Sequence, residues 1–167
     1  MNVSPIQFEL SNVAEAIERA LETTGLDPSR LDIEITEGVF VRNASQTTEA
    51  LEMIRAMGVG IALDDFGTGY SSLGYLGRLP IDTIKIDQRF IRELPADQES
   101  IAIVTAVLSL SHALGKSVVA EGIETRAQAD LLRAAGCEIG QGYYFGRPMA
   151  GTSFAEMASE PKVAAFA

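Results

Sequence analysis

The chain has almost no cysteine or histidine, and each shortage excludes a class of protein. The one cysteine among its 167 residues, Cys137, rules out an intrachain disulfide framework and is typical of a reducing compartment. The one histidine, His112, falls inside a predicted helix, which leaves no plausible triad for nucleophilic catalysis. We therefore expect chemistry that depends on neither side chain, in the cytoplasm.

Long apolar runs and basic residues are also scarce. No apolar run reaches the roughly 18 residues of a membrane span, and the N-terminus lacks the basic and then apolar segments of a signal peptide. The 13 basic residues face 23 acidic ones, and the net charge of −10 disfavours binding to a nucleic-acid polymer. A small anionic ligand is still compatible with this charge, because a bound metal reverses the local field.

Strand-like and helix-like segments alternate along the chain. The expected strands are Asn2–Val3, Leu31–Ile35, Ile61–Leu63, Thr83–Ile86, Ser117–Ala120 and Ile139–Tyr144. The expected helices cover 13–23, 47–57, 98–114 and the stretch from a capping box at Thr125 to Gly136. This alternation predicts an α/β fold with a parallel sheet covered by helices. Without a linker-like stretch, we predict one domain over residues 1–153 and a tail over 154–167.

An open doubly wound sheet and a (β/α)₈ barrel both fit this alternation, and the placement of polar residues favours the barrel. One polar residue lies at or just after each expected strand: Asn2, Glu34, Asp64, Lys85, Glu121 and Gln141. They are separated by 32, 30, 21, 36 and 20 residues, each roughly one βα unit. Consecutive units that each contribute a polar group at the same end would surround the mouth of a barrel. An open sheet would gather its ligand groups at one switch point.

The clearest chemical signal is the pair Asp64-Asp65, which ends an apolar run and precedes a glycine-rich loop. Asn2, Glu34 and Asp64 offer hard oxygen ligands that suit Mg²⁺ or Mn²⁺. With Asp65 added, two ions about 4 Å apart could share the cluster and support phosphoryl displacement. Lys85 could hold a water or a phosphate oxygen. Glu121 could bind a metal or act as general base.

Each of these residues also has a plainer interpretation. Asp64-Asp65 could initiate a turn, since Asp often precedes glycine-rich sequence. Glu34 and Glu37 could lie on a solvated strand edge, and Lys85 could lie on the surface of an edge strand. Glu121 and Gln141, each followed by glycine, could be turn residues. Their joint placement is much less probable under these interpretations than any one residue alone.

The same residues carry a resemblance to a known family. The stretches that carry it are Glu34–Glu37, Asp64–Leu73, Leu79–Asp82, Ile84–Asp87, Ala120–Thr125 and Gln141–Phe145. In this order they resemble the successive motifs of the EAL domain, a family of cyclic di-GMP-specific phosphodiesterases. The resemblance covers roughly Asn2 to Met149. It implies a (β/α)₈-type barrel that linearises cyclic di-GMP to pGpG in bacterial second-messenger signalling.

The resemblance also implies roles for individual residues. Asn2, Glu34 and Asp64 would be metal ligands, and Asp65 would help form a second metal site for Mg²⁺ or Mn²⁺, with Ca²⁺ inhibitory. Lys85 would position the attacking water or bind metal-linked groups, Glu121 would be the general base or a second-site ligand, and Gln141 would orient the water. Glu37 would anchor the loop after Asp65. This loop, with Phe66, Gly67, Thr68 and Gly69, would couple ligand binding to metal binding and to homodimerisation.

One departure from the family pattern stands out. The Glu-Ala-Leu motif that names the family, whose glutamate binds metal, does not precede Asn2. A (β/α)₈ barrel typically needs about 250 residues, so we expect an incomplete barrel that lacks its first strands and helices. Truncation of a longer protein, gene decay and completion of the barrel by another chain compete as explanations. Intact motifs favour truncation, from a parent with a possible sensory or cyclase-type domain.

Three functions follow from these observations. The first is a phosphodiesterase domain whose activity is impaired without the preceding segment. The alternative is a non-catalytic EAL-like module that binds cyclic di-GMP or a protein partner. The third is an unrelated α/β metal-dependent hydrolase, which requires the ordered motifs to be coincidental.

Overall fold

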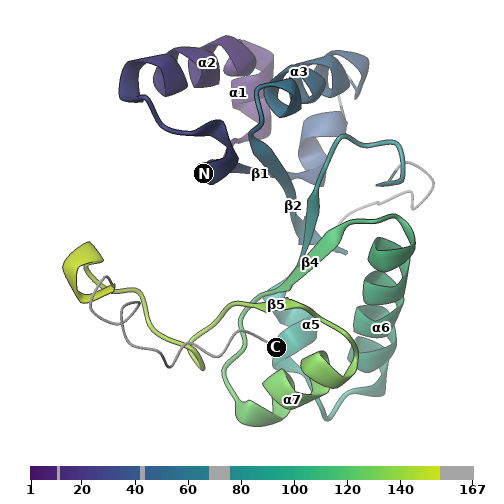
Figure 1. Cartoon of the computed structure of the whole chain (residues 1–167). Helices are drawn as coiled ribbons and strands as arrows, with labels where there is room; N and C mark the ends of the chain where they lie inside the picture. The colour runs from purple at the N-terminus through teal and green to yellow at the C-terminus, as the bar shows by residue number, and fades with distance from the viewer. Residues whose placement is uncertain (11, 42–43, 68–75, 155–167) are drawn as a thin grey trace.

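The described part of the chain, in this computed structural model, comprises residues 1–10, 12–41, 44–67 and 76–154. Within it, a parallel sheet of five strands is flanked by helices (Figure 1). The strands are β1 (Asp32–Thr36), β2 (Gly60–Phe66), β3 (Thr83–Ile86), β4 (Ser117–Ala120) and β5 (Ile139–Gly140). The α-helices are α1 (Pro5–Leu10), α2 (Val13–Thr24), α3 (Ala44–Ala56), α5 (Gln88–Arg92), α6 (Gln98–Ala113) and α7 (Arg126–Ala134). Two short 3₁₀ helices are η1 (Pro28–Arg30) and η2 (Glu37–Phe40).

The order of the strands decides between the two predicted architectures. Each strand pairs in parallel with the next along the chain, from β1 to β5, without a reversal. A doubly wound sheet would reverse its strand order at a switch point, whereas sequential parallel pairing is the pattern of a barrel wall. The described fold is therefore α/β and forms part of a TIM-type barrel, as predicted.

The two faces of the sheet are buried to different extents. Isoleucines on β1, β2 and β3 form the core on the face that packs against the helices, and Ile33, Ile35, Ile84 and Ile86 are fully buried there. The opposite face is less evenly buried, because Glu34, Thr83 and Val119 are only partly buried there while Ala62 and Lys85 are buried. This unequal burial fits a barrel wall whose inner face is not fully enclosed by the described strands.

Local sequence accounts for the ends of the longer helices. The side chain of Asn12 accepts a hydrogen bond from the backbone N–H of Glu15 at the start of α2, and left-handed Gly25 ends that helix. The capping box at Thr125 is complete, since its hydroxyl and the Gln128 side chain bond each other's backbone N–H groups. These predicted helix boundaries are confirmed.

Other predicted boundaries were wrong. The strand expected over Ile139–Tyr144 ends at Gly140, because the backbone N–H of Tyr144 turns back to the carbonyl of Ile123. The strand expected at Asn2–Val3 is a single parallel bridge between Asn2 and Glu34. Helices α1 and α5 and both 3₁₀ helices were not predicted, because segments of three to six residues carry too little periodicity.

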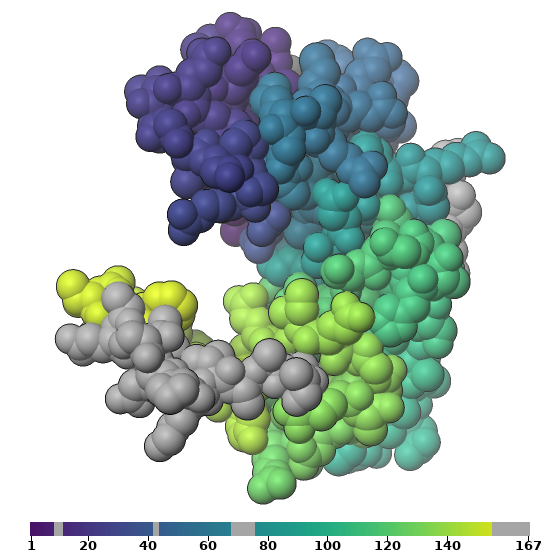
Figure 2. All heavy atoms as spheres, in the orientation of Figure 1, coloured from purple at the N-terminus to yellow at the C-terminus, as the bar shows by residue number. Residues whose placement is uncertain are grey.

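The sheet has two open edges in the described part of the chain. Strand β1 has only the Asn2 bridge beyond it, and β5 pairs with β4 alone. The N-terminal segment (purple) and the arm that follows β5 (yellow) lie on either side of an open notch (Figure 2). Across the described residues, none of the helices has the length and apolar character needed to cross a membrane.

Candidate active site

The register of the sheet brings the predicted polar residues onto one face. Glu34 pairs with Ala62, two residues before Asp64, and Lys85 pairs with Val119, two residues before Glu121. Side chains two residues apart along a strand point to the same face, and paired residues on parallel strands share it. Register therefore places Glu34, Asp64, Lys85 and Glu121 together toward the carboxyl ends of their strands.

Lys85 lies at the centre of this group. Its Nζ is 2.9 Å from Glu34 Oε1, 3.1 Å from Asp64 Oδ1 and 2.7 Å from Glu121 Oε1, and its side chain is 8% exposed. Burial alone would lower the pKa of Lys85. The hydrogen bonds to Glu121 and Glu34 and the nearby Asp64 outweigh burial and hold this pKa above its ordinary value. Lys85, on β3, is therefore a charged link to β1, β2 and the end of β4 rather than a surface lysine.

One carboxylate oxygen of the group makes an ion pair with Lys85 but no well-formed hydrogen bond. Asp64 Oδ1 is buried and has no hydrogen bond, although Lys85 Nζ lies 3.1 Å away. The ammonium attracts this oxygen as an opposite charge, in a geometry too poor for a full hydrogen bond. A buried carboxylate oxygen without a hydrogen bond is costly in free energy, and a cation would satisfy it.

Asp65 reaches the same site through an irregular backbone. Neighbouring side chains on a regular strand point to opposite faces, which would separate Asp65 from Asp64. The register between β2 and β3 shifts between Leu63 and Phe66, and Asp65 has a left-handed φ of 53°. Carboxylate oxygens of Asp64, Asp65 and Glu121 consequently lie within 4.8 Å of one another. Left-handed non-glycine residues store strain that functional sites often retain.

The charge of the site fits a metal ion. Three carboxylates, from Glu34, Asp64 and Glu121, contact the ammonium of Lys85, and Asp65 lies beside Asp64 and Glu121. Arg89 partly offsets the charge of Asp65, but negative charge stays in excess. Burial, followed by repulsion from Asp64, raises the pKa of Asp65. Burial also raises the pKa of Glu121, against the opposing effect of its bond to Lys85. Clustered hard oxygen donors with uncompensated charge are the ligand set of a divalent cation.

Asp87 is a site residue to which the sequence analysis gave no role. It is 6% exposed, caps the N-terminus of α5 through the backbone N–H of Arg89 at 2.7 Å, and shares a side-chain hydrogen bond with Asp65. Burial would raise the pKa of Asp87, but the bonds from Arg89 lower it below the ordinary value. The sequence feature that could have identified Asp87 is its position two residues after Lys85, which places both side chains on the same face of the chain.

The backbone of Gly122 turns the chain away directly after Glu121. Its φ is 72°, and a Cβ atom there would lie 2.6 Å from Cβ of Gln88. Only glycine avoids both the strain and the contact. The turn leaves Glu121 at the site, directly after β4, while the following segment approaches Gln88 of α5.

The predicted metal ligand Asn2 and the predicted water-orienting residue Gln141 are positioned at the site by backbone hydrogen bonds. Asn2 is placed beside Glu34 by hydrogen bonds from Val3 N–H to the Glu34 carbonyl and from Glu34 N–H to the Met1 carbonyl. Gln141 donates its N–H to the Ala120 carbonyl at 2.9 Å. Both side chains are exposed, and their predicted roles stay predictions.

The predicted loop after Asp65 is only partly described. Phe66 ends β2 and is buried, and Gly67 has a left-handed φ of 94°. Thr68 and Gly69 lie outside the described residues. Glu37 begins η2, directly after β1, and its predicted anchoring of this loop stays a prediction.

Comparisons with known proteins agree with this geometry. A model of the EAL domain family matches residues 1–148. The chain is 46% identical over 149 residues to MucR of Pseudomonas aeruginosa, a bifunctional diguanylate cyclase and cyclic di-GMP phosphodiesterase. That alignment covers 89% of this chain and 22% of MucR, so the chain spans under a quarter of this relative.

Solved structures show the same fold. The structure of the MucR phosphodiesterase with c-di-GMP superposes with a TM-score of 0.87 at 45% identity, over 92% of this chain and 62% of that one. The manganese and cyclic di-GMP complex of BlrP1 from Klebsiella pneumoniae gives a TM-score of 0.81 at 34% identity, over 89% of this chain and 38% of that one.

Proposed function

The chain belongs to the EAL domain family, and we propose that its acidic site hydrolyses cyclic di-GMP to the linear dinucleotide pGpG. The observation that carries this proposal is the convergence of Glu34, Asp64 and Glu121 on Lys85, with Asp65 beside them. MucR and its c-di-GMP complex support the choice of substrate. The family match makes the hypothesis of an unrelated metal-dependent hydrolase wrong.

Hydrolysis requires water to attack phosphorus while the bond from phosphorus to the 3′ oxygen breaks. Two Mg²⁺ or Mn²⁺ ions, held by Asn2, Glu34, Asp64 and Asp65, would supply Lewis acidity and lower the pKa of the attacking water. Glu121 accepts the proton of the water, and burial, which raises the pKa of Glu121 above its ordinary value, favours proton uptake. Lys85 orients the carboxylates and offers positive charge to phosphate oxygens, and Gln141 orients the water.

The metal requirement follows from charge. The site carries excess negative charge and the chain has a net charge of −10, so a phosphodiester anion would be repelled from the site without cations. We therefore expect binding of cyclic di-GMP to depend on Mn²⁺ or Mg²⁺. Ca²⁺ accepts the same oxygens in looser geometry and is expected to inhibit.

Removing one ligand tests the metal site without an activity assay. Asp64→Asn should weaken Mn²⁺ binding by at least about 100-fold, because the buried oxygen that lacks a hydrogen bond loses its charge. Isothermal titration calorimetry measures the effect directly. The matched control is Asp130→Asn, the same change on the exposed surface of α7, which should leave Mn²⁺ affinity unchanged. Equal affinities in the two variants would contradict a metal site at Asp64.

Activity is tested on the chain by itself and on an extended form. We expect little or no conversion of cyclic di-GMP by the folded chain with Mn²⁺, because the described sheet has five of the eight strands of a barrel. Adding the preceding part of an EAL domain, taken from MucR, should restore conversion to pGpG, read by chromatography. Equal activity with and without that segment would contradict the expected impairment. Metal-independent binding of cyclic di-GMP, with no hydrolysis by the extended form, would favour a non-catalytic module.

The wider assembly is part of the same proposal. Homologues such as MucR are multi-domain proteins, which supports a parent that joins this domain to a sensory or cyclase-type domain. A homodimer coupled to the loop after Asp65 is the proposed form of that parent, in the cytoplasm.

A further inference from the structure

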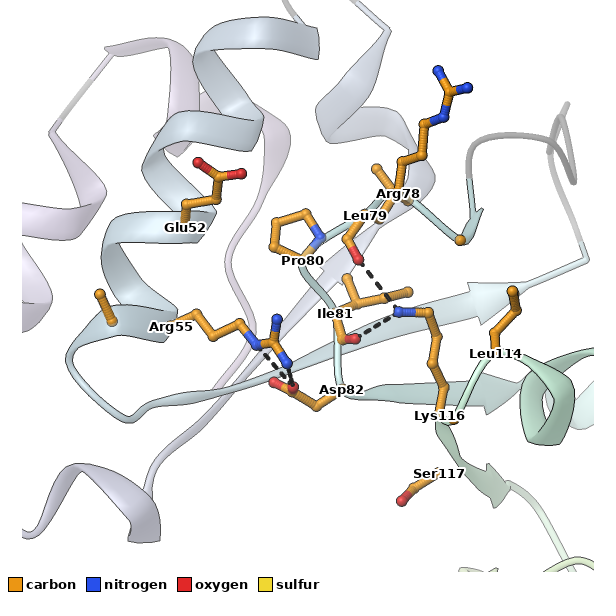
Figure 3. A pocket seen from close by; sticks show the side chains of 13 residues that line it. Glu52, Arg55, Arg78, Leu79, Pro80, Ile81, Asp82, Leu114, Lys116 and Ser117 are labelled. Carbon is orange, nitrogen blue, oxygen red and sulfur yellow. Dashed lines mark hydrogen bonds and ion pairs between the residues drawn. The ribbon is translucent and has the colours of Figure 1, made fainter.

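A second concave site lies at the opposite end of the strands from the acidic cluster. It is a hollow of about 840 Å³, open to solvent, lined by the last turn of α3 and by the segments that lead into β3 and β4. We call it the lower pocket; Figure 3 shows its side chains. Small-molecule sites usually have volumes of about 300–1,000 Å³.

The lower pocket collects positive charge in an otherwise acidic chain. Arg55, Arg78 and Lys116 line it, against Glu52 and Asp82. Arg55 is paired with Asp82, with Nε at 3.1 Å and NH2 at 3.0 Å from Asp82 Oδ1. The other oxygen of Asp82 already accepts the backbone N–H of Ile61 at 3.1 Å. Asp82 therefore has little capacity left to neutralise Lys116.

Lys116 is held in place but not neutralised. Its Nζ donates to the carbonyls of Ile81 at 2.9 Å and Leu79 at 3.3 Å, as the dashed lines in Figure 3 show. An ammonium has three protons, so one remains for a ligand. Burial, and then the charge of Arg55, lower the pKa of Lys116, while Asp82 opposes this weakly. An anion bound beside Lys116 would raise this pKa and offset both effects.

Apolar side chains complete the walls. Leu79, Pro80 and Leu114 line the same hollow as the charged groups. A fixed cation beside apolar walls is the usual design of a site for a small amphipathic molecule, in which polar groups orient the ligand and apolar surface adds affinity.

We propose that the lower pocket binds a small organic anion. Its phosphate or carboxylate group lies against Lys116 and Arg55, and its apolar part lies against Leu79, Pro80 and Leu114. The site is separate from the acidic cluster and needs no metal. It is independent of the proposed phosphodiesterase activity, because it occupies the amino ends of the strands whose carboxyl ends carry Lys85 and Glu121.

The test is a titration of the ¹⁵N-labelled chain with phenyl phosphate in EDTA, followed by amide chemical shifts. We expect saturable shifts at Ile81, Asp82, Lys116 and Ser117, and binding at least about threefold tighter than for inorganic phosphate, because the phenyl ring buries apolar surface. Shifts that gather instead at Asp64 and Glu121, or no saturation with either probe, would overturn the proposal.

Variants assign the binding to the lower pocket. Lys116→Gln should weaken phenyl phosphate binding at least about fivefold, since it removes a charge-assisted hydrogen bond. The matched control is Arg126→Gln, the same loss of one charge on the exposed surface of α7, which should change nothing. Equal affinities in the two variants would overturn the proposal.

A further pair of variants keeps the test valid if Lys116→Gln does not fold. Arg78 and Glu52 are exposed and have no ion pair within the described residues, so changing them should leave folding intact. Arg78→Gln should weaken binding about twofold, whereas Glu52→Gln should tighten it by a similar factor, as expected for partly screened charges. Identical affinities in both variants would show that the pocket does not select an anion.

Discussion

Replacing Lys85 with methionine is expected to destabilise the fold by about 3 kcal/mol at neutral pH, because it leaves three partly buried carboxylates facing one another without a cation. The side chain of Lys85 is 8% exposed, and its partners Glu34, Asp64 and Glu121 are between 17% and 27% exposed, so solvent cannot screen the repulsion fully. Methionine keeps most of the volume of the lysine stem, which separates loss of charge from loss of packing. Chemical denaturation with and without Mn²⁺ measures the effect.

The loss of stability in Lys85→Met should be largest at neutral pH and smaller in acid. In the wild type the pKa of Lys85 is raised, so its stabilisation is complete at neutral pH and would be lost only in strong alkali. In the variant, repulsion between the carboxylates raises their pKa values in the folded state. The fold therefore loses stability at pH values above the ordinary carboxyl pKa, and regains it when acid protonates these groups. The difference from wild type should shrink as pH falls from 7 towards 4. A difference that does not change with pH would show that Lys85 contributes only packing.

A double-mutant cycle provides the control. Adding Glu34→Gln to Lys85→Met removes one of the opposing charges and should recover part of the lost stability. In the wild-type background the same Glu34→Gln change should destabilise, since it breaks an ion pair of 2.9 Å. Additive effects of the two substitutions would contradict the central role given to Lys85.

Replacing Glu121 with glutamine should lower the turnover of cyclic di-GMP by about 1,000-fold, the usual range for loss of a positioned general base. The change keeps the shape of the side chain but removes its ability to accept a proton. Glutamine also removes the charge that Lys85 contacts at 2.7 Å, so the melting temperature should fall, as expected for Glu34→Gln. Turnover is measured on the extended form, and circular dichroism on the same sample confirms folding.

Measuring Mn²⁺ affinity alongside turnover distinguishes the two possible roles of Glu121, general base and metal ligand. Loss of turnover with intact Mn²⁺ affinity assigns the role of base, whereas loss of both assigns that of metal ligand. Glu138→Gln, the same change on an exposed residue outside the site, should keep full activity. Full activity of Glu121→Gln would contradict a catalytic role in either form.

Much of the fold could be predicted because its signals are local. Buried parallel strands require apolar runs, so the cores of β1 to β4 were visible as such runs. The starts of α2 and α7 depend on side chains within four residues of one another, at Asn12 and Thr125. Spacing by one βα unit was enough to predict that Glu34, Asp64, Lys85 and Glu121 share one end of the sheet.

Other features depend on contacts between segments that are distant in sequence. Asp64 and Asp65 point into one site because the register between β2 and β3 shifts and Asp65 adopts a left-handed backbone. Asp87 becomes a partner of Asp65 only when β3 lies beside β2. The lower pocket needs α3 and the segments before β3 and β4 to meet.

The sequence by itself determined the apolar cores of β1 to β4 and which residue types meet at the acidic site, since apolar runs and the spacing of βα units are local features of the chain. Only the tertiary structure decided which oxygen lacks a hydrogen bond, how three carboxylates share one lysine and where the second pocket lies. Those features arise from distances between atoms on different strands and helices, and such distances are set by packing and the twist of the sheet, which no local stretch of residues encodes.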